Sequence, residues 1–311
     1  MKRIKKLIKR FFLSSTESNL DFNTAQYVYE VTQKNALEKL ANTMKHDLAI
    51  ITFQYDTLKD NFEQAKSALN EYGIVIIENA FSENDSTNVT EKFETVKNEV
   101  YLAKEKKTDI ETTQFYVDVE NMKFKTYKDK SDFDKTLFDI RSGADEGMID
   151  VFNYDYLDEE NGKKLRTIFE SNLVLKLIES ASGKRYSPKN LNLYYNQNIV
   201  ETRGFHVDSY SRGQMKAFIY LTDVVDNSYG PYSYVLKSHN DAELEKFNKS
   251  MGFIGKRAKT DAYFLDTSNA FPILGKRGTL VISDQGGIHR GHPQEEGKQR
   301  MVAVLNYIIN R

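Results

Sequence analysis

Short β-rich segments dominate the sequence from residue 191 to the C-terminus, and this succession constrains the fold more than any other feature. Helical patterns occupy much of the chain before them, and long irregular connections join the strands. Helices first and then many strands predict an α+β fold with an antiparallel β-sandwich or jelly roll. The expected strands of this part cover residues 191–196, 214–225, 232–236, 279–283 and 301–309.

The earlier part of the chain also contains regular patterns. Apolar residues recur with helical spacing over residues 57–71, and the stretch 24–46 has a helical composition. Gly73 opens a run of four β-branched residues, which predicts a buried strand at 72–79. Further helices are expected from a capping cluster at 82–85 to about 107, at 162–170 and at 173–182, and further strands at 115–119, 122–127 and 148–152.

The N-terminus is basic and amphipathic. Six of the first ten residues are Lys or Arg. The apolar residues fall on one helical face: Ile4, Leu7, Ile8 and Phe11. Residues 1–13 therefore predict either a helix on an anionic membrane surface or a solvated tail. We expect three parts in the chain: a basic segment with a linker (1–23), a helical extension (24–71) and a core domain (72–311).

The composition excludes several classes of protein. Lys and Arg number 44 against 45 Asp and Glu, whereas a dedicated nucleic-acid binder has a basic excess. There is no Cys, which excludes disulfides, thiolate metal sites and a Cys nucleophile, and fits a reducing compartment. No apolar run approaches the roughly 18 residues of a membrane span. We expect a cytoplasmic protein that binds no nucleic acid, at the inner face of the membrane if residues 1–13 bind there.

A metal site without Cys needs His, Asp or Glu, and the chain has five His. Non-haem iron oxygenases hold the metal with two His and one carboxylate. His206-Val207-Asp208 offers one His and the carboxylate of this pattern. Both can bind one ion, because residues i and i+2 of an extended chain point to the same side. Another set, His239-Asn240-Asp241, precedes a helical run and is better explained as a helix cap. Since about one residue in seven is acidic, a single His-x-Asp is weak evidence.

The C-terminal stretch supplies a further His and a cation. Residues 278–284 predict a strand, which is followed by a glycine turn and His289. Arg300 begins the next strand, and its planar guanidinium suits the far end of a metal-bound dicarboxylate. Arg290 is an alternative anchor, and His292 either supports the site or is a turn residue before a proline.

From about Tyr72 to its end, the chain resembles the phytanoyl-CoA dioxygenase family of Fe(II)/2-oxoglutarate oxygenases. The resemblance covers roughly three quarters of the chain. It rests on the opening run at 72–79, on Arg203-Gly204-Phe205-His206-Val207-Asp208, on Gly230-Pro231 leading to Lys237-Ser238-His239, and on His289-Arg290-Gly291 with Arg300 eleven residues beyond His289. It implies a double-stranded β-helix, that is, a cupin-like jelly roll, with helices packed on one side and an N-terminal helical extension.

The resemblance also implies roles for four residues. His206, Asp208 and His289 would bind Fe(II), and Arg300 would bind the far carboxylate of the cosubstrate 2-oxoglutarate. With O2 as the second cosubstrate, the enzyme would hydroxylate a C–H bond and release succinate and CO2. Halogenating relatives lack the carboxylate ligand, so its presence here favours hydroxylation or another oxidation that starts with the same hydrogen abstraction.

Other contacts to the cosubstrate stay open. Some family members place Ser where this chain has Gly291, so a different side chain would have to help. The candidates are Thr279, Tyr194 and Lys216.

The substrate and two alternative functions also stay open. Tyr-rich strands and the basic residues Arg203, Arg212 and Lys216 near the expected site favour a small molecule or a lipid- or glycan-linked substrate with an anionic group. The alternatives are a catalytically silent jelly-roll scaffold and a cupin-like metal enzyme that does not use 2-oxoglutarate. The sequence does not determine the oligomeric state.

Overall fold

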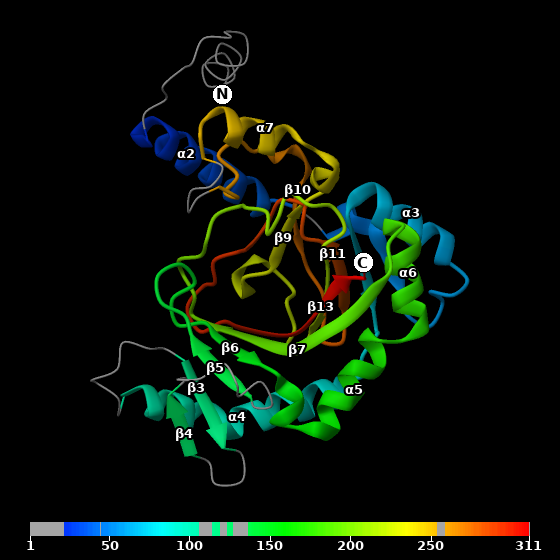
Figure 1. Cartoon of the computed structure of the whole chain (residues 1–311), viewed down its shortest axis with the longest axis vertical. Coiled ribbons are helices and arrows are strands. Elements are labelled where there is room, and N and C mark those ends of the chain that lie inside the picture. The colour runs from blue at the N-terminus through cyan, green and yellow to red at the C-terminus, as the bar shows by residue number, and fades with distance from the viewer. Residues whose placement is uncertain are drawn as a thin grey trace.

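The computed structural model describes residues 22–43, 45–105, 114–118, 123–126, 136–253 and 259–310. Over these residues the chain forms a mixed α/β structure in which a large and a small β-sheet face each other (Figure 1). The strand order of the large sheet is β1-β2-β11-β8-β13-β7-β6-β5-β3-β4, and that of the small sheet is β10-β9-β12. β1 pairs with β2 in parallel, and the other pairs are antiparallel.

Helices and strands alternate as far as α6, and strands dominate from β7 onward, with α7 among them. The α-helices are α2 (Phe22–Leu40), α3 (Phe62–Tyr72), α4 (Glu83–Glu105), α5 (Glu159–Phe169), α6 (Asn172–Ser182) and α7 (Glu243–Ser250). Short 3₁₀ helices are η1 (Lys45–Ile51), η2 (Tyr154–Tyr156), η3 (Asn227–Tyr229), η4 (Ser238–Asn240) and η5 (Thr267–Asn269). The strands are β1 (Thr52–Gln54), β2 (Ile74–Glu78), β3 (Gln114–Asp118), β4 (Lys123–Thr126), β5 (Leu137–Ile140), β6 (Ile149–Phe152), β7 (Tyr186–Gln197), β8 (Met215–Tyr220), β9 (Tyr232–Val235), β10 (Ala270–Ile273), β11 (Leu280–Asp284), β12 (His289–Gly291) and β13 (Gln299–Ile309).

Local sequence signals explain several element boundaries. The side chain of Asp158 accepts a hydrogen bond from the backbone N–H of Asn161 and begins α5 before residue 162, where periodicity had placed its start. Ser171 caps α6 in the same way. Four short strands were not predicted from the sequence, because three or four residues show too little periodicity to be recognised: β1, β5, β10 and β12.

The central strands of the large sheet are buried on both faces. Every residue of β11 is buried, as are Met301 to Leu305 of β13. Alternate side chains of a strand point to opposite faces, so one set packs toward the helices and the other faces the small sheet. In β8, Ala217 and Ile219 belong to the first set, whereas Lys216 and Phe218 line the space between the sheets.

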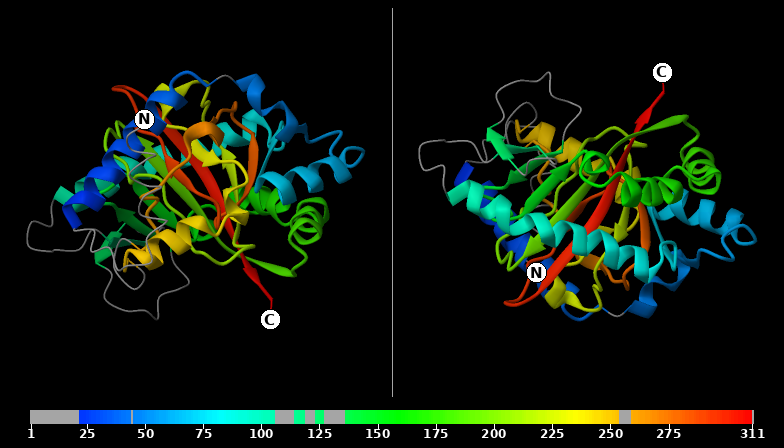
Figure 2. Two further views of the ribbon diagram at one scale, coloured as in Figure 1. Left: turned by 90° about the horizontal axis from the view of Figure 1, so that it is seen from above. Right: turned by 90° about the horizontal axis from the view of Figure 1, so that it is seen from below.

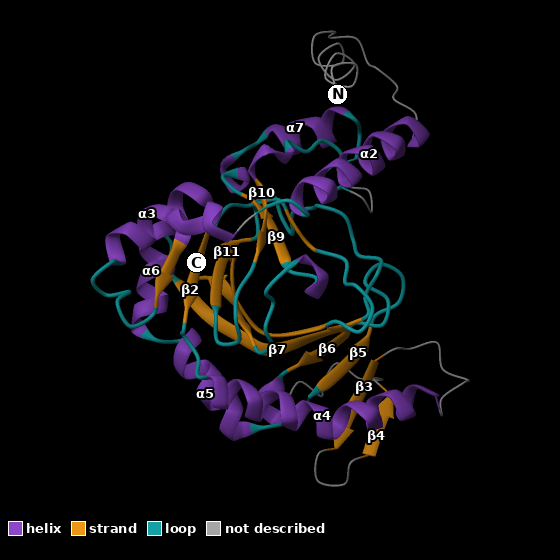
Figure 3. Ribbon diagram, turned by 180° about the vertical axis from the view of Figure 1, so that it is seen from behind, coloured by secondary structure: helices purple, strands orange, loops and turns teal. Residues whose placement is uncertain are grey.

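Helices lie on two sides of this core, not on one. Seen from below, α4 crosses the outer face of the large sheet, with α5 and α6 beside it (Figure 2). α2 and α7 lie at the other end, near β9 and β10, as the view from behind also shows (Figure 3). Ala36 and Leu40 of α2 pack with Val235 and Ala270 in a separate apolar cluster. The expectation of helices on one side was therefore wrong for α7, because the small sheet also has an apolar outer face to bury. α2 belongs to the expected N-terminal helical extension.

Among the described residues, no helix combines the length and the apolar character needed to cross a bilayer. The basic segment 1–13 lies outside the described residues.

Candidate metal centre

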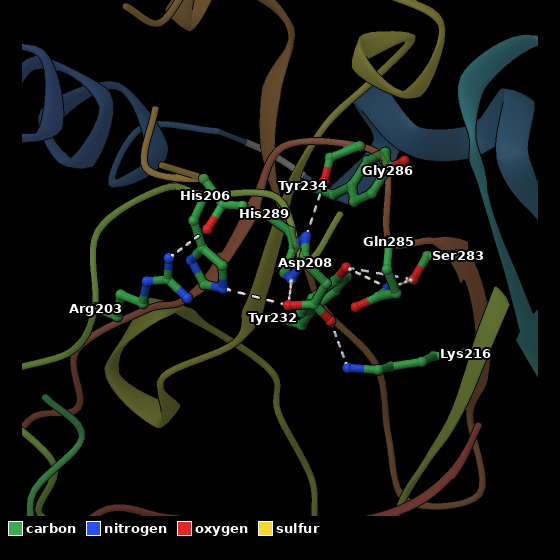
Figure 4. A network of polar contacts seen from close by, with 12 residues as sticks. Arg203, His206, Asp208, Lys216, Tyr232, Tyr234, Ser283, Gln285, Gly286 and His289 are labelled. Carbon is green, nitrogen blue, oxygen red and sulfur yellow. Dashed lines mark hydrogen bonds and ion pairs between the residues drawn. The ribbon is translucent and has the colours of Figure 1, made fainter. Parts of the chain in front are cut away.

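Three potential metal ligands come together between the two sheets. His206 and Asp208 lie in the loop between β7 and β8, and His289 begins β12. One nitrogen of each imidazole and one carboxylate oxygen lie within 4.8 Å of one another. Both imidazoles point at the carboxylate of Asp208 (Figure 4). In the described part of the chain, this is the group of His and acidic side chains arranged to hold a metal ion.

Backbone carbonyls orient both imidazoles. Nδ1 of His206 lies 2.8 Å from the carbonyl oxygen of Gly204, and Nδ1 of His289 lies 2.8 Å from that of Gly287. A carbonyl oxygen only accepts, so each Nδ1 carries the proton and donates it. Nε2 of each ring then presents its free electron pair to the centre. Such outer hydrogen bonds fix ring orientation at metal sites.

The arrangement fits a cation. Nε2 of His206 and of His289 lie 3.8 and 3.6 Å from Oδ1 of Asp208, which is too long for hydrogen bonds. Burial lowers the pKa of His206 to about 3, so that imidazole stays neutral near neutral pH. Burial opposes the ionised form of Asp208, but His289 and Lys216 outweigh it and lower the pKa of this carboxyl. Two imidazole nitrogens and a carboxylate facing one point suit a divalent metal.

The two ligand segments are also joined through their backbones. His206 and His289 exchange both backbone hydrogen bonds, with N···O distances of 3.0 and 2.8 Å. The side chain of Gln33, from α2, accepts a hydrogen bond from the N–H of Phe205 at 2.6 Å and donates one to the carbonyl of Ala262 at 3.2 Å. The N-terminal helix therefore supports the loop that carries the first ligand.

Substitution of Gly287 by alanine is expected to damage this centre. A Cβ there would lie 1.8 Å from the hydroxyl of Tyr234, which is fully buried and donates to the carbonyl of Asp284. The turn between β11 and β12 must shift and carry the carbonyl that orients His289 with it. We expect a loss of about 1–3 kcal/mol of stability and a roughly 10–100-fold loss of metal affinity, measured by thermal unfolding and by metal titration.

Gly183→Ala is the matched control for that substitution. Gly183 ends α6 with φ +70°, and a Cβ there would meet no atom within 4 Å. Its replacement should lower stability by about 1 kcal/mol through backbone strain alone. Equal metal affinity in Gly287→Ala and Gly183→Ala would contradict the role assigned to the Gly287 carbonyl.

A cavity of about 330 Å³ opens beside the three ligands. Its walls come from both sheets. Tyr220 of β8 and Val302 of β13 face it from the large sheet, where they are direct cross-strand neighbours. Tyr232 of β9 faces it from the small sheet, with its ring centroid 5.5 Å from that of His289. The cavity is thus large enough for small organic molecules and reaches the candidate metal ligands.

Arg300 lies in the cavity wall, 9% exposed. It donates hydrogen bonds to the carbonyl of Gly230 and, at 3.2 Å, to the side chain of Asn196. Its Nε is buried without a partner, and no carboxylate of the described residues pairs with it. Burial lowers the pKa of Arg300, which is the signature of a cation that lacks an anion.

The other candidates for cosubstrate contacts lie in different places. Tyr194 lines the cavity. Lys216 also lines it, but its ammonium is 2.6 Å from Oδ2 of Asp208, so it pairs with the candidate ligand itself. Thr279 does not belong to the cavity wall, because its side chain lies where a Cβ of Gly275 would be.

The second His-x-Asp set has a structural role. His239 is buried and lies 3.1 Å from the carbonyl of Asn70, away from the three ligands. Asp241 accepts a hydrogen bond from the backbone N–H of Glu243 at 2.8 Å, where α7 begins. The N-cap of α7 is Ala242 and makes no side-chain cap hydrogen bond, so this set does not form the helix cap that the sequence predicted; Asp241 contacts the first turn of α7 from one residue earlier.

Several residues of the site were not found from the sequence. Gln33 comes from a helix about 170 residues before the loop it supports. Arg141 lines the cavity and pairs with Asp150 at 2.8 Å. No local pattern marks either residue. The repeated Gly-x-His arrangement at 204–206 and 287–289 was a usable signal, since a glycine two residues before each His supplies the orienting carbonyl.

His292 predicts a pH dependence of stability. Burial, with a smaller contribution from Arg290 and Arg300, lowers its pKa from 6.5 to about 4, and its Nδ1 is buried without a partner. The unfolded chain therefore binds more protons between pH 6.5 and 4, so stability falls as the pH falls through this range. We expect His292→Gln to remove up to about 3 kcal/mol of that loss, measured by urea unfolding of metal-free protein at several pH values. Parallel pH profiles in wild type and variant would refute the assignment.

No family model and no curated protein matches the sequence. The structure is similar to that of AviO1 from Streptomyces viridochromogenes, with 16% identity, TM-score 0.46, and coverage of 79% of this chain and 93% of that one. The non-heme alpha ketoglutarate dependent carbocyclase SnoK from nogalamycin biosynthesis matches with 17% identity, TM-score 0.47, and coverage of 80% and 83%. EctD from S. alaskensis with bound Fe matches with 13% identity, TM-score 0.44, and coverage of 78% and 74%. All three identities are below 25% and all three TM-scores are below 0.5, so the proposed function rests on the residues of this chain.

Proposed function

We propose that this protein is an Fe(II)- and 2-oxoglutarate-dependent oxygenase that hydroxylates a C–H bond. The observation that carries the proposal is one cavity holding both a His, Asp, His group and a buried arginine without a carboxylate partner. The first suits a divalent metal with open positions, and the second suits the free end of a dicarboxylate. The two facing sheets around the cavity are what a double-stranded β-helix would provide.

Each residue has a defined task in this proposal. His206, Asp208 and His289 would hold the metal, and the carbonyls behind the imidazoles keep both Nε2 atoms directed at it. Arg300 would bind the far carboxylate of 2-oxoglutarate. When bound, the iron and the cosubstrate would supply the oxidising chemistry, in which O2, 2-oxoglutarate and a substrate C–H group yield succinate, CO2 and a C–OH group on the substrate. Lys216 keeps Oδ2 of Asp208 occupied, which leaves Oδ1 for the metal.

An anaerobic titration tests the proposal. Metal-free protein receives Fe(II) and then 2-oxoglutarate, and the charge-transfer absorption of the chelate is followed. We expect the band to appear with saturable dependence on both. Admission of O2 should then release succinate slowly even without substrate. Well-folded protein that binds Fe(II) without developing the band would indicate a metal enzyme that does not use 2-oxoglutarate, and protein that binds neither would indicate a silent scaffold.

We further propose that residues 1–13 bring the enzyme to an anionic membrane surface. Their six basic residues and single apolar face support this. Deletion of residues 1–13 is expected to abolish co-sedimentation with vesicles that contain phosphatidylserine, while binding of neutral vesicles stays negligible in both forms. Equal co-sedimentation of the full and truncated chains would refute it.

A further inference from the structure

Cationic side chains outnumber anionic ones in the cavity wall. The cations are Arg141, Arg203, Lys216, Arg290 and Arg300, and the carboxylates are Asp145 and Asp208. Three of the cations have acidic partners at hydrogen-bond distance. Arg141 pairs with Asp150, Arg203 with Asp261 at 2.6 Å, and Lys216 with Asp208. Among the described residues, Arg290 and Arg300 lack such a partner.

Arg290 is the less expected of these two arginines. It is 4% exposed, and its Nε and Nη2 donate to neutral oxygens only, the carbonyl of Gly291 at 3.1 Å and the hydroxyl of Thr202 at 2.6 Å. Its Nη1 makes no hydrogen bond with any described residue. Burial lowers the pKa of Arg290 to about 10, which still leaves it charged near neutral pH. A buried charge of this kind is costly unless an anion meets it.

The guanidinium is held in place before any ligand arrives. The hydroxyl of Thr202 accepts from Nη2 and donates to the same Gly291 carbonyl at 2.7 Å, which closes a small ring of hydrogen bonds. The guanidinium carbon Cζ of Arg290 lies over the ring of Phe205, 5.6 Å from the ring centroid. Arg290 lines the same cavity as the three candidate metal ligands.

A dicarboxylate whose other end binds the metal brings one free carboxylate to a cavity with two such arginines. On the proposed function, 2-oxoglutarate occupies Arg300, and Arg290 is left for a second anion in the same cavity. We propose that Arg290, held by Thr202, binds an anionic group of the substrate, so that the oxidised molecule carries a carboxylate or a phosphate. The inference rests on the proposed function for the role of this second ligand, while the anion site itself stands on the contacts of Arg290.

Binding of simple anions to metal-free protein tests the site without depending on iron. The probes are acetate and inorganic phosphate, with acetamide as the uncharged match of acetate, and the readout is the melting temperature. In an Arg300→Met background, which removes the other unpaired cation, we expect at least one anion to raise the melting temperature and acetamide to have no effect. Adding Arg290→Met should lower the affinity for that anion about tenfold or more, as read from the dependence of the melting temperature on anion concentration. Adding Arg185→Met should leave this affinity unchanged. Arg185 is a suitable control because its side chain is 83% exposed and lies outside the cavity wall.

Two further variants keep the result interpretable. Arg290→Lys preserves the charge and should retain part of the response, and Thr202→Val should weaken it by releasing the guanidinium. The stronger response, to acetate or to phosphate, identifies the class of substrate anion. An anion response that survives Arg290→Met, or none in the Arg300→Met background, would overturn the proposal.

The Fe(II)-2-oxoglutarate band separates this proposal from the function proposed above. Arg290→Met should keep the affinity for 2-oxoglutarate. If that affinity falls in Arg290→Met and is unchanged in Arg300→Met, Arg290 is the cosubstrate anchor and the substrate role is wrong. If wild type gives no band but Arg290 still binds anions, the oxygenase proposal fails and the anion site remains.

Discussion

His289→Ala is expected to abolish turnover, because it removes one of three ligands, and the described residues place no further His or acidic side chain in that group. His289 is buried, and its Nε2 faces Asp208 at 3.6 Å. Loss of an outer hydrogen bond at a metal site costs about 10–100-fold in affinity, so loss of a ligand should cost more than about 100-fold. Titration with Fe(II), or with Co(II) as a coloured substitute, measures the affinity directly, and succinate release measures turnover.

His239→Gln is the matched control for that substitution. His239 is also buried and is also followed by an acidic residue at the second position, but its Nε2 lies against the carbonyl of Asn70. This variant should lose stability and keep the metal affinity of wild type. If His289→Ala bound metal as tightly as His239→Gln, the assigned centre would be wrong.

Arg300→Met is expected to weaken 2-oxoglutarate binding by about 30- to 1000-fold, since leaving a buried charge without its partner costs about 2–4 kcal/mol. The lost positive charge should cause this weaker binding of 2-oxoglutarate, because we expect the cavity to keep its shape in Arg300→Met. The structure adds a second expectation. Nε of Arg300 is buried without a partner, so the metal-free variant should be as stable as wild type or more stable. The midpoint of the charge-transfer titration and the melting temperature of metal-free protein give the two results.

The combination of these two results is diagnostic. A merely structural arginine would lose stability on substitution without a selective change in 2-oxoglutarate affinity. Arg300→Lys offers a further comparison, because it keeps the charge and loses the planar fork. It should recover part of the affinity. Unchanged 2-oxoglutarate binding in both variants would show that another residue holds the cosubstrate.

Much of the fold could be predicted from local patterns. The buried run of β2 was evident from four consecutive β-branched residues, and the helix α6 from its apolar face and the glycine that ends it. The start of α3 was placed too early, at 57, because apolar spacing continues into the turns before Phe62. The outer location of α2 could not be seen, since it depends on packing of Ala36 and Leu40 against strands more than 190 residues later.

For the candidate site too, some features could be predicted from the sequence and others could not. The sequence by itself determined the donor types: without Cys and with five His, a metal site had to use imidazole and carboxylate, and short-range spacing singled out His206 and Asp208. Tertiary structure alone decided which cations are neutralised. Lys216 pairs with Asp208 and Arg203 with Asp261, whereas Arg290 and Arg300 line the cavity with no carboxylate of the described residues at hydrogen-bond distance. Spacing along a chain reports which side of a strand a residue occupies, but charge pairing depends on through-space distances between strands far apart in sequence, which no local pattern encodes.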